Sequence, residues 1–234
     1  MDHAMSRASR IWTAATYVLL VLMLADLYLV FLWAPAEKTM GDVQRIFYFH
    51  VPSAWVAFLA FFMVFVGSVV YLIKRDLRYD RLALASAEIG VAFCTIVLVT
   101  GPIWARPAWG IWWTWDARLT STLVLWLIYV SYLLLRGFVE EPLRKAVLAA
   151  VVGIVGFADV PIVYMSIRWW RTQHPSPVFA GGRDSGLDPQ MRIAFFFSLA
   201  VFTVLFAVLV NFSTRVKLAE QLLGNLHRRI AIKE

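Results

Sequence analysis

The sequence is poor in cysteine and in charged residues. Its 234 residues include one cysteine, Cys94, so no disulfide can form within the chain, and its place in an apolar run predicts that it packs as a small hydrophobic side chain. Only 16% of the residues are charged, whereas 61% are hydrophobic. This composition excludes a soluble domain and indicates a multi-pass membrane protein. The sequence also lacks a GxxxxGK[ST] motif, so any ATPase that acts with it must be another chain.

Six apolar runs are long enough to cross a bilayer as helices. They predict an all-α integral membrane protein with six transmembrane helices, arranged as a single domain over residues 1–234. The first run is far longer than the ~7–15 apolar residues of a secretory signal, so we expect a membrane helix rather than a cleaved signal peptide. The runs lie at residues 11–34, 53–73, 82–103, 119–135, 146–167 and 193–212.

The lysines and arginines predict the orientation of these helices. Fourteen of the 22 fall in the N-terminal segment, the 74–81 and 136–145 loops and the C-terminal tail, and eight fall in the 35–52, 101–120 and 168–192 loops. Because positive charge is retained on the cytoplasmic side, we expect both termini in the cytoplasm and the latter three loops on the far side. The net charge of +7 is then explained by basic cytoplasmic loops and not by binding to nucleic acid.

Residues 101–120 hold five of the eleven tryptophans. If the chain is helical from Ala108 onward, Trp109, Trp112, Trp113 and Asp116 share one face, which together with Trp115 would form an aromatic shelf ending in a carboxylate. Such a shelf suits a flat, apolar ligand. The alternative is that the tryptophans only anchor the chain where the membrane meets water, although five in so short a stretch are more than an anchor requires.

Two of the four histidines fall in the far-side loops that flank the tryptophans. His50 precedes Val51-Pro52 and His174 precedes Pro175, whereas His3 and His227 belong to the predicted cytoplasmic ends. A lone loop histidine is usually a surface residue, but two beside an aromatic shelf provide the axial nitrogen ligands and the stacking surface that an iron porphyrin needs. Zinc is disfavoured, because zinc sites use three or four closely placed ligands and the sequence has no His/Cys cluster.

Three segments carry a resemblance to a known family. WGIWWTWDARLT at 109–120 resembles the tryptophan-rich "WWD" signature of heme-handling membrane proteins, and RIFYFHVPSAW at 45–55 and ADVPIVYMSIRWWRTQHP at 158–175 resemble the histidine-bearing segments of one family among them. That family is cytochrome c maturation protein C, also called heme exporter protein C, and the resemblance covers nearly the whole chain. It implies a protein that is not an enzyme. Such a protein binds non-covalent heme b (iron protoporphyrin IX) at the outer face of the bacterial cytoplasmic membrane.

The resemblance also implies partners and residue roles. The family presents heme to a membrane-anchored heme chaperone, cytochrome c maturation protein E, and works with a small single-span protein (D), an ABC-type pair (A and B) and membrane lipid. Axial ligation is carried over to His50 and His174, and heme contact to the tryptophan motif, here Trp109, Trp112, Trp113, Trp115 and Asp116. Heme propionates prefer guanidinium partners, so Arg106, Arg118 and Arg171 are candidate propionate contacts, with Asp116 an alternative partner for Arg118.

Two other functions stay open at this point. The first is a heme-transporting permease subunit of an ABC-type complex, which uptake of heme into sealed vesicles containing only this protein would favour. The second is a heme–apocytochrome ligase of the same WWD superfamily, whose members are generally larger and carry more histidines near the membrane. The small size of this chain and its two far-side histidines argue against the ligase.

Three carboxylates fall within the predicted spans: Asp26, Glu88 and Asp159. Such groups are costly in lipid and tend to face a bundle interior or a partner. For Glu88, near the predicted cytoplasmic end, we favour a structural role. Asp159 lies two residues before Pro161, and this proline is expected to loosen its helix and free backbone carbonyls.

Overall fold

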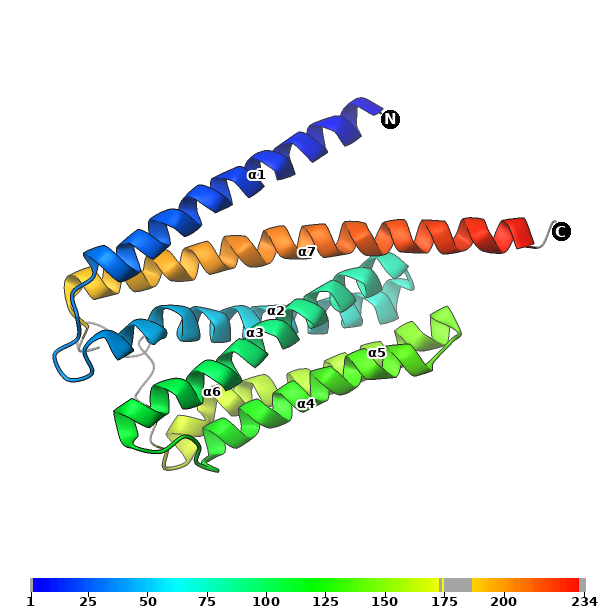
Figure 1. Cartoon of the computed structure of the whole chain (residues 1–234). Coiled ribbons are helices and arrows are strands. Elements are labelled where there is room, and N and C mark those ends of the chain that lie inside the picture. The colour runs from blue at the N-terminus through cyan, green and yellow to red at the C-terminus, as the bar shows by residue number, and fades with distance from the viewer. Residues whose placement is uncertain (1, 173, 175–186, 232–234) are drawn as a thin grey trace.

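A computed structural model of the chain describes residues 2–172, 174 and 187–231. Its helices run antiparallel along one bundle, and the beginning of α1 and the end of α7 lie at the same end of it (Figure 1). Within these described residues, six helical segments are long and apolar enough to cross a membrane, which confirms the predicted all-α fold with six spans. The elements are α1 (Asp2–Tyr28), η1 (Leu29–Trp33), η2 (Asp42–Ile46), α2 (Phe47–Lys74), α3 (Leu77–Trp109), α4 (Ala117–Phe138), α5 (Pro142–Phe157), α6 (Asp159–Trp169) and α7 (Pro189–Ala231).

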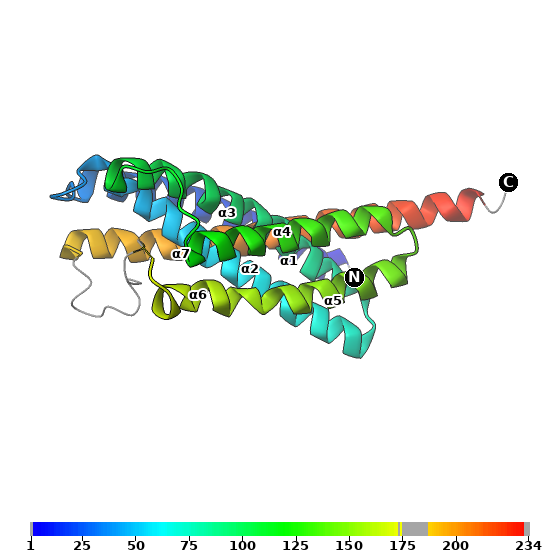
Figure 2. The same cartoon turned by 90° about the horizontal axis from the view of Figure 1, so that it is seen from below.

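The fifth span is broken where the sequence predicted a loosened helix. Proline at position 161 has no N–H to donate to the carbonyl of Phe157, four residues earlier, and the helix is interrupted at Ala158. Helices α5 and α6 therefore lie end to end as two pieces of one span (Figure 2). The Oδ2 atom of Asp159, the first residue of α6, is buried and has no hydrogen-bond partner among the described residues.

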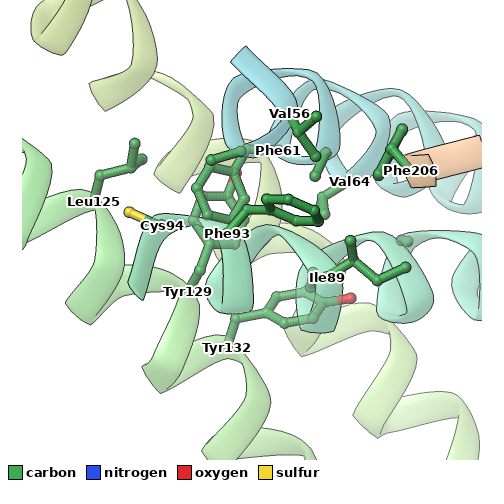
Figure 3. Close-up of a cluster of buried hydrophobic side chains, with 14 of the residues drawn as sticks. Val56, Phe61, Val64, Ile89, Phe93, Cys94, Leu125, Tyr129, Tyr132 and Phe206 are labelled. Carbon is green, nitrogen blue, oxygen red and sulfur yellow. The ribbon is translucent and has the colours of Figure 1, made fainter. Parts of the chain in front are cut away.

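The largest buried cluster is formed mainly by side chains of α2, α3 and α4, with single residues from α5, α6 and α7 (Figure 3). The ring of Phe61 on α2 stacks on that of Tyr129 on α4, with centroids 3.8 Å apart and planes 8° from parallel. Gly90 on α3 allows this contact, because a Cβ there would lie 2.7 Å from Cε1 of Phe61. Cys94 is buried in the same cluster, as predicted for a small hydrophobic side chain.

Pairs of polar side chains join α7 to α3 and to α1. Glu88 on α3 accepts a 2.6 Å bond from Lys217 on α7, which agrees with a structural role for that carboxylate. Asp26 on α1 is hydrogen-bonded at 2.6 Å to Ser198 on α7 and is buried at that contact. Because α1 packs mainly against α7, this bond links an otherwise widely exposed helix to the rest of the bundle.

Candidate functional site

Both candidate histidines lie at the end of the bundle opposite the beginning of α1 and the end of α7. We predicted His50 in a loop, and this is wrong: it is the fourth residue of α2, which begins at Phe47 directly after the short helix η2. Its Nδ1 lies 2.8 Å from Oγ1 of Thr100 on α3, and its ring meets that of Trp104 edge-on at 5.8 Å. Two rigid helices therefore fix the position of His50.

His174 follows α6 and is held by a polar network. Its Nδ1 lies 3.4 Å from Oγ1 of Thr172 and 3.8 Å from Oδ2 of Asp116, and its ring centroid is 5.9 Å from that of Trp109. Burial, aided by the positive charge of Arg118 and opposed by Asp116, lowers the pKa of His174 to about 4. At pH 7 the imidazole is therefore neutral, which is the form that ligates metal.

One cavity brings the two histidines together. It is lined by His50 from α2, His174 from the segment after α6, Arg118 from α4 and Trp113, along with apolar residues of α2 and α3. A second cavity adjoins it and shares His174 and Trp113. The first cavity has a volume of about 50 Å³, room for a few water molecules but not for a porphyrin. A flat ligand held by both imidazoles thus requires the walls to move apart.

The tryptophans do not form the helical face that we considered. Helix α3 ends at Trp109, because Gly110 adopts a left-handed conformation (φ 79°) and its N–H bonds to the carbonyl of Arg106. Residues 110–116 are not helical, so Trp109, Trp112 and Trp113 lie on no common helix face. Trp113 lines both cavities, Trp109 and Trp112 line the second, and Trp115 lines neither, while Trp112 and Trp115 are also exposed.

Asp116 is not the end of an aromatic face but the N-cap of α4. Its Oδ1 accepts from the backbone N–H groups of Arg118 and Leu119, at 2.9 and 3.0 Å. Its Oδ2 accepts from the hydroxyls of Thr114 and Thr172, both at 3.1 Å. Burial raises the pKa of Asp116, but these hydrogen bonds and the nearby His174 outweigh it, so the net shift is downward and the group is ionised at pH 7.

The three candidate arginines differ sharply in their surroundings. Arg106 donates to the carbonyl of Gly110 and is exposed, as is Arg171. Arg118 lines the cavity beside both histidines, and its Nη1 is buried without a hydrogen-bond partner in the described part of the chain. A buried guanidinium nitrogen without a partner is costly, and a carboxylate ligand would satisfy it.

Sequence reasoning missed the threonines of this site. Thr100 lies 50 residues from His50, and no sequence pattern links the two. Thr172 did carry a signal, because a threonine two residues before His174 can accept its backbone N–H in a local turn, and it does so at 3.2 Å. The described part of the chain does not include the segment 175–186, which contains Arg183, or the side chains of His3 and His227.

Comparison with known proteins decides the family. The sequence model described as "Heme exporter protein C" matches residues 2–229. The chain belongs to this family. Heme exporter protein C of Bradyrhizobium diazoefficiens is 39% identical over 199 residues, which cover 85% of this chain and 74% of the relative. Those of Rhodobacter capsulatus and Escherichia coli K12 are 32% and 34% identical, covering 93% and 76% of this chain and 90% and 71% of the relatives.

Membership in the Heme exporter protein C family confirms the resemblance that the tryptophan and histidine segments carried. The match extends over all six spans and includes both histidine-bearing segments and the segment between α3 and α4.

Proposed function

We propose that this chain binds heme between His50 and His174 and presents it to a membrane-anchored heme chaperone for the biogenesis of c-type cytochromes. The observation that carries the proposal is one cavity lined by both imidazoles, by a guanidinium whose Nη1 atom is buried and by a tryptophan. Iron porphyrins take axial imidazole nitrogens, their propionates take arginine, and their rings stack on aromatic side chains. Relatives named as heme exporters support the same ligand.

The proposed ligand is non-covalent heme b, handled as cargo. Covalent attachment of the c type needs a C-x-x-C-H motif, and the sequence has the single Cys94, buried in the core. The proposed role of this chain is to hold, orient and release heme, with no catalytic residue of its own. Trp113, which lines both cavities, and the more exposed Trp112 and Trp115 would contact the porphyrin.

The proposed setting is the bacterial cytoplasmic membrane, with the site at the periplasmic face. The distribution of lysine and arginine supports this orientation, because the site lies at the end with fewer of them. The proposed partners are cytochrome c maturation protein E as the heme acceptor, the single-span protein D, the ABC-type subunits A and B, and membrane lipid.

An absorption spectrum of the purified protein tests the proposal directly. Titration with hemin is expected to give a six-coordinate, low-spin spectrum, and addition of the heme-free chaperone is expected to move the heme onto it. Size separation of the two proteins after mixing shows where the heme resides. A protein that binds no hemin at micromolar concentration, or that keeps it in the presence of the chaperone, contradicts the proposal.

Replacing Arg118 with lysine is expected to weaken heme binding by about 10-fold, because the buried charge-assisted bond to a propionate contributes roughly 1.5–3 kcal/mol and a lysine restores only part of it. The low-spin spectrum is expected to stay unchanged, since neither histidine is altered. Arg106→Lys and Arg171→Lys are the matched controls at the same end of the bundle, and hemin titrations measure all three. Weaker binding in the two controls together with normal binding in Arg118→Lys would place the propionates elsewhere.

A further inference from the structure

The ring of His50 lies beside the hydroxyl of Thr100, which already donates its proton to another acceptor. Oγ1 of Thr100 lies 2.7 Å from the carbonyl oxygen of Ile96, one turn earlier on α3, and 2.8 Å from Nδ1 of His50. A carbonyl oxygen can only accept, so the short contact to Ile96 is a hydrogen bond only if the hydroxyl donates to it. Oγ1 then accepts from His50, and Nδ1 must carry the proton. The opposite arrangement leaves two oxygens 2.7 Å apart with no proton between them.

The ring of His174 is in the same situation. The hydroxyl of Thr172 donates to Oδ2 of Asp116 at 3.1 Å, on the carboxylate whose Oδ1 accepts the backbone N–H groups that cap α4. The threonine oxygen then accepts from the backbone N–H of His174 at 3.2 Å and faces Nδ1 at 3.4 Å. The carboxylate oxygen itself lies 3.8 Å from Nδ1. Both groups beside Nδ1 are therefore acceptors, and Nδ1 is the protonated nitrogen.

The chain contains the same arrangement twice with tryptophan, whose ring nitrogen can only donate. Nε1 of Trp126 donates to Oγ1 of Thr95 at 2.8 Å, and Thr95 donates to the carbonyl of Val91 at 2.8 Å. Nε1 of Trp55 donates to Oγ1 of Thr203 at 3.2 Å, and Thr203 donates to the carbonyl of Leu199 at 2.7 Å. A helical threonine that donates to the preceding turn is thus used in this fold as an acceptor for a ring N–H, which is the arrangement assigned to His50 and Thr100.

We propose that Thr100 and Thr172 are positioning residues that hold His50 and His174 in the Nδ1–H tautomer, so that each imidazole presents Nε2 to the heme iron. A neutral imidazole has one N–H and one lone pair, and fixing the proton on Nδ1 leaves the lone pair on Nε2. The inference rests on the proposed function for the identity of the metal. It concerns residues of this chain that no family resemblance singled out.

The tautomer matters because an imidazole that carries its proton on Nε2 presents an N–H to the iron. It cannot bind the metal until that proton moves to Nδ1. Hydrogen bonds to the other ring nitrogen also fix the plane of the ring and raise its basicity, and their loss typically weakens metal binding ~10–100-fold. The two threonines act from different elements, Thr100 from α3 and Thr172 from the segment after α6. Each histidine is therefore prepared separately, before heme arrives.

The tautomers can be read in the heme-free protein. The full chain, labelled with ¹⁵N-histidine and held in lipid bilayers at pH 7, gives ¹⁵N chemical shifts that distinguish a protonated from an unprotonated ring nitrogen. His50→Gln and His174→Gln assign the signals by deletion. We expect Nδ1–H at both positions, a shift of His50 toward Nε2–H in Thr100→Val, and the same for His174 in Thr172→Val. Thr100→Ser and Thr172→Ser keep the hydroxyl and are expected to retain the wild-type tautomers.

Hemin titration gives the second measurement. Thr100→Val and Thr172→Val are each expected to weaken heme binding ~10–100-fold, and the serine variants to restore it. Thr95→Val is the matched control, because it removes the same kind of hydroxyl from the same helix but faces Trp126 instead of a histidine. It is expected to change neither the histidine tautomers nor heme affinity.

The outcomes separate this inference from the proposed function. Nε2–H at either histidine in the wild type, or tautomers that do not respond to the valine substitutions, overturns the positioning role even if heme binds normally. Nδ1–H at both histidines in a protein that binds no hemin leaves the positioning role standing and removes the proposed function.

Discussion

Replacing either His50 or His174 with alanine is expected to abolish the six-coordinate, low-spin heme spectrum and to block transfer of heme to the chaperone. Each variant leaves one face of the iron without a protein ligand, because the two imidazoles reach the cavity from separate elements, α2 and the segment after α6. Hemin titration followed by absorption spectroscopy measures the first effect, and incubation with heme-free chaperone measures the second.

The fold is expected to survive both substitutions. In the heme-free protein, His50 makes one side-chain hydrogen bond, to Thr100, and a bond of this kind contributes only about 1 kcal/mol. A loss of heme with normal membrane abundance therefore reports on ligation and not on folding. Added imidazole is expected to restore part of the low-spin spectrum by occupying the vacated position.

Two further histidines provide internal controls. His3→Ala and His227→Ala remove imidazoles from the predicted cytoplasmic ends of the chain and are expected to change neither the spectrum nor the transfer. The decisive comparison is the double variant that lacks both His50 and His174. If it still gives a low-spin, six-coordinate spectrum, other residues hold the iron and the present assignment is wrong.

The membrane spans could be predicted from the sequence because hydropathy adds up over about 20 residues, and errors at single positions cancel. The same argument placed His50 and His174 at one end of the bundle. The missing N–H of Pro161 separately predicted a loosened helix, and the structure has its break at Ala158. These features depend on composition and on local backbone chemistry, which one sequence displays directly.

Helix ends could not be predicted equally well, because polar and aromatic residues extend the helices beyond the apolar runs. Helix α2 begins at Phe47, six residues before its predicted start, and α3 continues through Pro102 and Pro107 to Trp109. Gly110 and Asp116 then set the ends of the tryptophan segment. The predicted aromatic face of one helix does not form for this reason. The spacing of its residues fits a helix, but the left-handed Gly110 lies between Trp109 and Trp112.

The contacts of the site depend on tertiary structure. The bond between His50 and Thr100 and that between Thr172 and Asp116 join residues separated by 50 and 56 positions. The local sequence does not show which threonine of an apolar helix contacts a histidine, because such a hydroxyl commonly donates to the preceding turn, as that of Thr214 does. The same holds for the arginines, because only the bundle shows that Arg118 lines the cavity with its Nη1 atom buried while Arg106 and Arg171 are exposed.

The tryptophan segment leads to the second large effect. Removing Trp112, Trp113 and Trp115 together by substitution with alanine is expected to abolish heme transfer to the chaperone, whereas single substitutions reduce it only in part. Each aromatic contact contributes roughly 0.5–1.5 kcal/mol beyond its buried area, so one loss changes binding about 2- to 10-fold and the remaining rings compensate.

The structure divides the roles of these tryptophans. Trp113 lines both cavities, so Trp113→Ala is expected to weaken heme retention. Trp112 and Trp115 are 58% and 74% exposed, and Trp112 lines only the second cavity. Their single variants are therefore expected to retain more heme than Trp113→Ala and to slow its transfer, because exposed rings are accessible to the chaperone. Hemin titration and the rate of chaperone loading separate the two effects.

A control pair separates heme contact from simple anchoring at the membrane surface. Trp169 and Trp170 are also exposed at this end of the bundle, with ring centroids 5.7 Å apart, but they line neither cavity. If the tryptophans served only as interfacial anchors, replacing this pair with alanine would impair the protein as much as the triple variant does. We expect the pair variant to load the chaperone normally. Normal loading by the triple variant at wild-type membrane abundance would instead show that the tryptophan segment takes no part in handling heme.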